Sequence, residues 1–520
     1  MQQQQGSDAV EPLLPEHNCK LEKLSIDEVL HVWAGEWGPA QVVHFMLLSL
    51  VWCLHGVLTF TMVFADRNPQ WVCTAQASVV DAGAAPLCTP SSSICSLDPS
   101  QWNWAHGDIE SIVSQWGLTC SHNFKVGLVQ CFFFMGTLLG CGVWRVLSDS
   151  FLGRKGVLIA TSFLGSILGM LTAFAPNYWA YVALRTATGF TVGGMGTSAF
   201  VLVTELGGSS KGGPISMSIL FFYSCSLVYI AALAYFIHFR WRLLYLLSSA
   251  PFGLYCLVIL PWMSESPRWY LARGNSDAAL AILKQVALRN GRTIPATITL
   301  KLDHAIEPQD RVVDVLRNAG TMDIFRISLL RKRMMAMLFI WLSCGLSYYG
   351  INLNVPNVGG DILLGLISNA VGGIAAFVVM AMMVQKHERR PVLICALLVC
   401  GVSSLGAAFA REARARMGYE MMAIFGAAGV YNLAYIYTAE LFPTEVRNAA
   451  MGLVALAAQV GSIAAPLVAM ASNVHGWLPF TIFCITSIMS CCLACWCLPK
   501  TLEKPLHENI KDMLKFKDPP

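Results

Sequence analysis

Ser264-Glu265-Ser266-Pro267-Arg268-Trp269 opens a polar stretch, residues 264–333, that divides this chain in two. The stretch carries twelve lysines and arginines and contains no long apolar run. On each side of it lie six segments of about 20 mostly apolar residues, each long enough to cross a bilayer. The pattern therefore predicts an all-α membrane protein with six helices, a central loop and six more helices.

The composition agrees with this reading. Of the 520 residues, 55% are hydrophobic and only 13% are charged, which excludes an ordinary soluble protein. The net charge of +4 gives no indication of a nucleic-acid partner. We expect these parts: a tail over 1–39, a six-helix bundle over 40–263 with a loop at 65–123, the central loop over 264–333, a second six-helix bundle over 334–498, and a tail over 499–520.

The distribution of basic residues predicts an orientation. With Met1 in the cytoplasm, 27 of the 35 lysines and arginines fall on the cytoplasmic side, seven fall outside, and Arg185 lies within the membrane. The positive-inside rule therefore places both tails and 264–333 in the cytoplasm and 65–123 outside. The first forty residues contain no apolar core, so we expect no cleavable signal peptide. We expect a multi-pass protein of the plasma membrane, with the vacuole or another endomembrane as the alternative.

The cysteines fall into two groups. Most lie in apolar spans, where cysteine behaves as a small hydrophobe, and the cluster in the last span has no histidine nearby, so we expect no metal site and no other cofactor. Four lie in the polar loop on the oxidising side. One or two disulfides are expected there, with three possible pairings if all four take part. These four are Cys73, Cys88, Cys95 and Cys120.

Polar residues inside the predicted spans have two readings. His44 and His55 are eleven residues apart, close to three helical turns, so they share one face of the first span. Arg185 lies deep in the fourth span and needs a partner or a watery cavity. Each of these side chains either packs against neighbouring helices or lines a cavity, and the sequence leaves both readings open.

The two halves repeat each other. Three matches occur at nearly constant offset and at corresponding positions in each half, which indicates an internal duplication. Parallel six-helix repeats are typical of the major facilitator fold, in which the substrate binds at the midplane between the halves. The matches are Arg154-Lys155 with Arg389-Arg390 and Glu205-Leu206 with Glu440-Leu441, both at 235 residues, and Leu260-Pro261 with Leu498-Pro499 at 238.

Several motifs give the chain a family resemblance over nearly all twelve spans. It resembles the organic ion transporters of the major facilitator superfamily, which include organic cation, carnitine and organic anion carriers. The large cysteine-bearing loop after the first span is typical of them, and the run Tyr348 to Val355 is most similar to the plant branch. The motifs are Gln115-Trp116-Gly117-Leu118-Thr119-Cys120, Arg185-x-x-x-Gly189, Thr204-Glu205, Glu265-Ser266-Pro267-Arg268-Trp269 and Glu440-Leu441-Phe442-Pro443-Thr444-Glu445-Val446-Arg447-Asn448.

The chain also departs from that family. Arg145 stands where the family has a glycine, and the loop at 385–390 lacks the usual aspartate and glycine. Cation carriers of the family have an acid in span eight and another in span eleven, and these positions are Gly373 and Gln459 here. Anion carriers have an arginine at the second position, which is also missing. The charge that would identify the substrate is therefore absent from both positions.

Two sets of functional residues are expected. Residues at the cytoplasmic helix ends, all charged except Gly153, should control conformational switching: Asp149, Gly153, Arg154, Lys155, Glu205, Glu265, Arg268, Glu440 and Arg447. A substrate site near the midplane should draw on both halves: His55, Arg185, Tyr223, Tyr348, Tyr349, Tyr431 and Gln459. Tyrosine rings attract a desolvated ammonium and arginine attracts a carboxylate, so a zwitterion such as carnitine satisfies both.

The resulting hypothesis is a secondary or facilitative carrier of small organic cations or zwitterions that works by alternating access, with a proton or sodium ion as a possible coupling partner. An organic anion, a sugar or another small solute is the alternative substrate. No Gly-x4-Gly-Lys-Ser/Thr motif indicates an ATP-driven pump, and no His-Glu-x-x-His or Gly-x-Ser-x-Gly motif indicates an enzyme, so we expect no catalytic residues. A non-transporting receptor or degenerate carrier is the main rival, because Arg145 and the eroded second loop favour it.

Overall fold

The computed structural model describes residues 22–35, 37–74, 88, 94–206, 212–301 and 324–501. Eleven of its helices are long and apolar enough to span a membrane, and α7, with the apolar run Phe221–Phe236, completes the twelve that the sequence predicts. The first six are α2 (Pro39–Ala65), α4 (Phe124–Asp149), α5 (Gly153–Thr172), α6 (Tyr178–Leu206), α7 (Gly212–Phe236) and α8 (Trp241–Val258). The second six are α13 (Ser328–Asn354), α14 (Ile362–Lys386), α15 (Arg389–Phe409), α16 (Ala413–Leu441), α17 (Thr444–Met470) and α18 (Leu478–Cys497).

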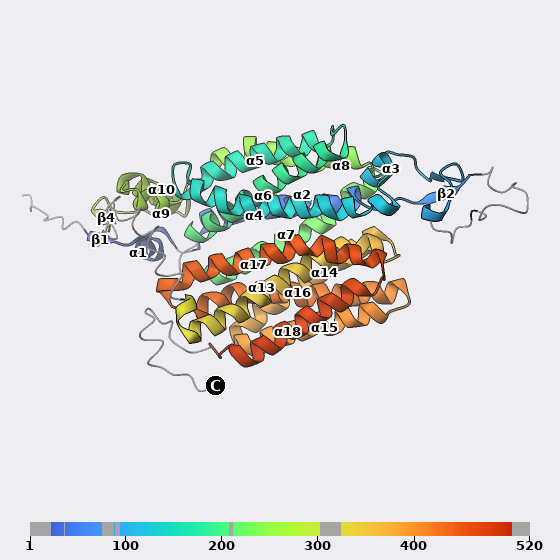
Figure 1. Ribbon diagram of the computed structural model, residues 1–520. Helices are drawn as coiled ribbons and strands as arrows, with labels where there is room; N and C mark the ends of the chain where they lie inside the picture. The colour runs from blue at the N-terminus through green and yellow to red at the C-terminus, as the bar shows by residue number, and fades with distance from the viewer. Residues whose placement is uncertain are drawn as a thin grey trace, which may run out of the picture.

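The two groups of six form separate layers that lie side by side (Figure 1). They meet along two helix pairs, α4 with α17 and α7 with α14. A shift of 235 residues, the offset of the sequence repeat, aligns α4 with α14 and α7 with α17. The two interface pairs are therefore built from equivalent helices of the two halves, as expected for a substrate path between duplicated halves.

Glycines allow the helices within each half to approach closely. A Cβ at Gly189 on α6 would collide with the backbone of Phe133 on α4, and a Cβ at Gly461 on α17 would collide with that of Leu342 on α13. Close backbone approach at small residues is the usual basis of helix packing in membranes, where lipid provides little hydrophobic driving force. Prolines mark the N-terminal ends of two helices: α17 begins directly after Pro443, and α18 has Pro479 in its first turn.

The central segment is folded over residues 264–301, although its sequence predicts a polar loop. Helices α9 (Pro267–Ala272) and α10 (Ser276–Arg289) are followed by strand β4 (Ile298–Leu300). Strand β4 pairs in parallel with β1 (Glu22–Leu24) from the N-terminal region. Helix α1 (Ile26–Val29) and the π-helical turn η1 (Leu30–Ala34) add apolar side chains to a small core with α10. This end of the molecule is called the loop end below.

The opposite end carries the disulfides and is called the disulfide end (Figure 1). It contains the two-stranded sheet of β2 (Trp71–Cys73) and β3 (Trp102–Trp104) and the short helix α3 (Ile112–Trp116). Trp116 packs between Tyr181 of α6 and Trp241 of α8, with ring centroids 5.5 Å from each. Helix α3 is therefore anchored on the first bundle by the aromatic contacts of Trp116.

Candidate functional site

Aromatic side chains from both halves meet in the middle of the molecule, and we call this group the tyrosine cluster: Tyr223 of α7, Tyr348 and Tyr349 of α13, and Tyr431 and Tyr435 of α16. The Tyr223 hydroxyl donates to the Tyr349 hydroxyl at 3.2 Å, a hydrogen bond between the two halves. Tyr348 lies 5.9 Å from Tyr431, centroid to centroid. Four of the tyrosines were expected at the site from sequence. Tyr435 was not, although its place one turn after Tyr431 puts both on one helix face.

The first span adds a polar and aromatic wall to the cluster. His55 stacks on Trp52 with centroids 5.2 Å apart and meets Tyr223 edge-on at 5.5 Å. His55 is 9% exposed. Within the described part of the chain, its Nδ1 and the Trp52 Nε1 have no hydrogen-bond partner. Buried polar atoms are normally paired, so these two are available to a polar solute.

Rings also close the cluster on the side toward the loop end. Phe200 of α6 stacks on Tyr435 of α16 with centroids 5.8 Å apart, another aromatic contact between the halves. Trp341 lies 4.6 Å from Tyr435, edge to face. A solute among these residues would face ring surfaces, hydroxyl groups and an imidazole, and the cluster itself contains no acid. Such a lining suits an organic cation held by ring faces.

Arg185 lies outside the cluster, behind Phe133. Both of its terminal nitrogens donate to the Leu58 carbonyl oxygen, at 3.3 and 3.2 Å, and its guanidinium lies 4.3 Å from the Phe133 ring centroid. It is 1% exposed. In this arrangement the Arg185 guanidinium binds the backbone of α2. Guanidinium has five donors, so further donors remain for a carboxylate.

The two positions at which the family resemblance implies an acid in cation carriers lie on α14 and α17. A Cβ at Gly373 would lie 2.6 Å from Ser224 Oγ of α7, so a side chain there would require Ser224 to shift. Gln459 is half-buried on α17. Its assignment to the site stays a prediction.

The predicted switching residues of the first half form a compact network at the loop end. Arg154 pairs with Asp149 at 3.1 Å and with Glu205 at 3.3 Å, joining α4, α5 and α6. Glu265 accepts hydrogen bonds from the backbone amides of Arg154 and Lys155 at the start of α5. Carboxylates are favourable at helix N-termini, and burial nevertheless raises the pKa of Glu265. Gly153 has a φ of 74° and allows the sharp entry into α5, where a Cβ would collide with Glu265.

The second half repeats part of this network. Arg389 pairs with Glu440 at 3.2 Å, as Arg154 does with Glu205, at the same offset of 235 residues. Thr501 donates to the other oxygen of Glu440 at 2.7 Å. The Nε of Arg447 donates to the Phe442 carbonyl oxygen at 3.3 Å.

Every ion pair that the structure gives for the predicted switching residues lies within one half of the molecule. Arg268 binds Asp27 of α1 at 2.6 Å and so joins the N-terminal region to α9. The assignment of these residues to conformational switching stays a prediction.

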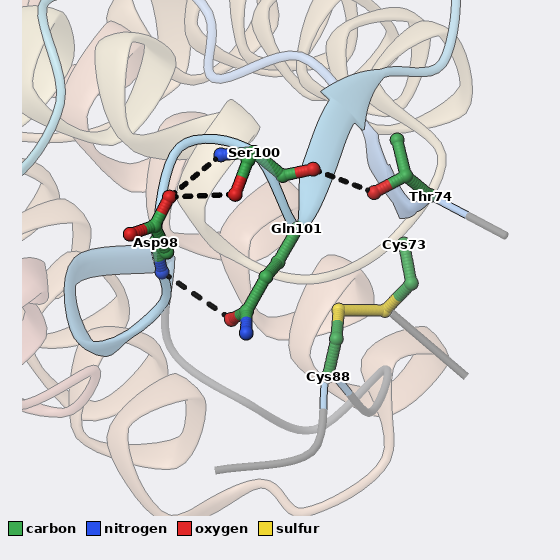
Figure 2. Close-up of a disulfide and its surroundings, with 6 residues drawn as sticks. All are labelled: Cys73, Thr74, Cys88, Asp98, Ser100 and Gln101. Atoms are coloured by element: carbon green, nitrogen blue, oxygen red, sulfur yellow. Dashed lines mark hydrogen bonds between the residues drawn. A yellow bond between two sulfur atoms is a disulfide. The ribbon is translucent and has the colours of Figure 1, made fainter. Parts of the chain in front are cut away.

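The four loop cysteines pair as Cys73–Cys88 and Cys95–Cys120, one of the three possible arrangements. Beside the first disulfide, the turn at Asp98 is held by hydrogen bonds to the amide and hydroxyl of Ser100, at 3.0 and 2.7 Å (Figure 2). Thr74 donates to the Ser100 carbonyl oxygen at 2.9 Å. The Thr74 bond ties the residue that follows β2 and Cys73 to the turn that precedes β3.

Comparison with known proteins agrees with the fold. The family model described as "Sugar (and other) transporter" matches residues 100–513. The chain belongs to this transporter family. It is 40% identical to "Organic cation/carnitine transporter 4" of Arabidopsis thaliana, covering 98% of this chain and 95% of the relative. It is 28% identical to "Organic cation/carnitine transporter 2" of Homo sapiens, covering 94% of each.

A solved structure shows the same fold at low identity. The inward-open xylose transporter XylE from E. coli superposes with a TM-score of 0.63 at 16% identity, covering 90% of this chain and 99% of that chain. Family and fold together make this chain a multi-pass membrane transporter of the major facilitator superfamily.

Proposed function

We propose that this transporter carries small organic cations and zwitterions such as carnitine across the plasma membrane, by alternating access between its two halves. The observation that carries the proposal is the tyrosine cluster, to which both halves contribute and in which Tyr223 and Tyr349 share a hydrogen bond across the interface. Rings from both halves can hold an ammonium by their faces, and separating the halves on one side would release it.

The same geometry accommodates a zwitterion. The ammonium would lie against Tyr348, Tyr349 and Tyr431, and the carboxylate would reach toward His55 and Trp52, whose ring nitrogens have no partner in the described chain. Arg185 would attract that carboxylate from behind Phe133, while two of its nitrogens donate to the Leu58 carbonyl oxygen. The names of the Arabidopsis and human relatives, organic cation/carnitine transporters, support the same substrate class.

The test is uptake by the purified chain in liposomes, with labelled carnitine, choline, a polyamine, an organic anion and a hexose. We expect saturable uptake of carnitine and choline and none of the anion or the hexose. Uptake of the anion or hexose alone would contradict the substrate assignment. Binding of carnitine without accumulation would indicate a receptor. Imposing a proton or a sodium gradient on the same vesicles then identifies the coupling ion.

A further inference from the structure

Glu420 on α16 is a buried acid that the proposed function does not use. Three acids of the described chain are buried, and two of them have partners. Asp66 accepts hydrogen bonds on both carboxylate oxygens, and Glu110 forms an ion pair with Arg67. Glu420 is 1% exposed, and its Oε1 has no hydrogen-bond partner within the described residues. Its carboxyl group therefore has no structural partner that explains its burial.

One charged group acts on Glu420 in the described chain, and that group is Arg416. Arg416 precedes Glu420 by four residues, so the two side chains are neighbours on one face of α16. The ion pairs of the described residues nevertheless include none between them. The acid and the base are thus adjacent but unpaired in this conformation.

The other charged residues around α16 lie away from Glu420. Of the helices that pack on α16, which are α7, α13, α14, α15 and α17, the first contains no charged residue. The tyrosines and cysteines of these helices are neutral at pH 7. The remaining charged residues either lie at the loop end or are exposed at the disulfide end. Those at the loop end are Arg331, Lys332, Arg333, Lys386, Arg389, Arg390, Glu440, Glu445 and Arg447, and the exposed ones are Asp361, Arg411, Glu412 and Arg414.

Arg416 holds two connections together at the disulfide end of the second half. Its Nη1 donates to the Val358 carbonyl oxygen at 3.3 Å, and its Nη2 donates to the Ala410 carbonyl oxygen at 2.9 Å. Val358 follows the turn η6 (Val355–Asn357) between α13 and α14, and Ala410 follows α15. The Arg416 Nε is buried and has no partner within the described residues, so this guanidinium can still donate to a carboxylate.

This arrangement fits a protonated Glu420. Burying an ionised carboxylate without donors is so unfavourable that such a group normally binds a proton instead. Loss of that proton would leave a carboxylate one helical turn from Arg416, where opposite charges attract. Formation of the pair would draw the guanidinium away from Val358 and Ala410 and would free both connections.

We propose that Glu420 binds the coupling proton of this transporter and that its protonation, acting through Arg416, closes the disulfide end of the second half. The proposal rests on the proposed alternating-access transport and adds the coupling ion. Glu420 takes a proton from the disulfide side, which releases Arg416 to bind the two carbonyl oxygens. After the halves have switched, the proton leaves to the loop side, and the pair with Arg416 reopens the disulfide end.

The position of Glu420 along α16 gives the proton a route to the substrate site. Tyr431 of the tyrosine cluster follows Glu420 by eleven residues, close to three helical turns. Both side chains therefore lie on the same face of α16. Water that reaches the cluster from the loop side meets the helix face that carries the acid, so one proton crosses the membrane with each solute.

The experiment measures carnitine accumulation driven by a pH gradient in liposomes that contain the full chain. The liposomes are prepared at pH 7.5 and diluted into labelled carnitine at pH 6.0, with potassium and valinomycin holding the membrane potential at zero. We expect accumulation of up to about 30-fold, the limit for one proton per solute across 1.5 pH units. Counterflow with both sides at pH 7.5 is measured in parallel, because exchange of solute requires no release of the proton.

Glu420→Gln keeps the shape of the side chain and removes the proton site. It should abolish accumulation driven by the pH gradient while carnitine counterflow continues, and Glu420→Asp should restore part of the accumulation. Glu412→Gln is the matched control, because Glu412 is an exposed acid at the start of the same helix and makes no side-chain cap. It should accumulate carnitine as the wild type does.

Two results would overturn the proposal. One is a wild type that shows counterflow but no accumulation in the pH gradient. The other is a Glu420→Gln protein that accumulates carnitine as the wild type does. The first result needs no variant, so a misfolded Glu420→Gln protein does not remove the test.

Failure of the transport function is distinguishable from failure of this site. If the wild type shows no counterflow, the transport proposal fails, and thiol labelling of the purified chain tests Glu420. Val358→Cys lies at a buried position and Asn357→Cys at an exposed one, so the ratio of their labelling rates cancels the intrinsic pH dependence of a thiol. We expect this ratio to rise several-fold from pH 6 to pH 8 and to stay constant when Glu420→Gln is added. A constant ratio with Glu420 present would overturn the site.

Discussion

Each tyrosine of the cluster offers a solute two different groups, a ring face and a hydroxyl, and substitution can separate them. Tyr349→Phe keeps the ring but removes the hydrogen bond to Tyr223, so we expect a changed transport rate and a loss of carnitine affinity of at most about tenfold. Tyr349→Leu also removes the ring face, worth ~2 kcal/mol for a desolvated ammonium, and should weaken affinity about 30-fold.

Kinetics of carnitine uptake by both variants check this prediction. Tyr235→Leu is the control, because Tyr235 is 62% exposed and lies outside the cluster. Equal affinity losses in the phenylalanine and leucine variants would show that the hydroxyl, and not the ring, holds the solute.

Gln459 tests how far the site extends along α17. Gln459→Asp introduces the acid that cation carriers of the family have in this span, so affinity for tetraethylammonium should rise relative to carnitine, by about tenfold for a charged contact. Competition of the two solutes for uptake measures the preference. An unchanged preference would remove α17 from the site.

The ion pairs at the loop end hold whole helices together. Arg154–Glu205 and Arg389–Glu440 each fasten adjacent helices within one half, and their side chains are only partly exposed. Pairs near water contribute roughly 0–1 kcal/mol, so a single substitution should shift conformational populations modestly. Glu440→Gln should therefore alter the transport rate by a few-fold, in line with such an energy, and leave KM nearly unchanged.

Glu205→Gln is the matched variant in the first half, and the repeat predicts a similar effect. The measurement is the maximal rate and KM of carnitine uptake for both variants. A changed KM with an intact rate would place Glu440 in the binding site instead of the switching network.

The orientation in the membrane is a prediction about the whole molecule. Basic residues place the loop end in the cytoplasm and the disulfide end outside. In intact cells, a membrane-impermeant thiol reagent should label a cysteine introduced at the exposed Asp98 and should not label one at Leu288, which is 72% exposed on α10. Permeabilised cells provide the control, in which both positions should react. Labelling of Leu288→Cys alone in intact cells would reverse the orientation.

Hydrophobic length and the internal repeat were enough to predict the spans and the fold, because both are local or periodic properties of the sequence. The packed central segment was missed: its core joins η1 near residue 30 to α10 near residue 283, a contact that no local pattern reveals. The partners of charged residues at the loop end also come from distant parts of the chain, as Asp27 does for Arg268, and so they could not be predicted from a local pattern.

Counterflow tests the central claim most directly, because it requires a site that opens alternately to the two sides. Liposomes containing the purified chain are loaded with unlabelled carnitine and diluted into labelled carnitine. The account predicts a transient accumulation of label above equilibrium, absent from empty liposomes and reduced by Tyr349→Leu. Label uptake that is the same with and without internal carnitine would contradict alternating access and leave a protein that only binds its solute.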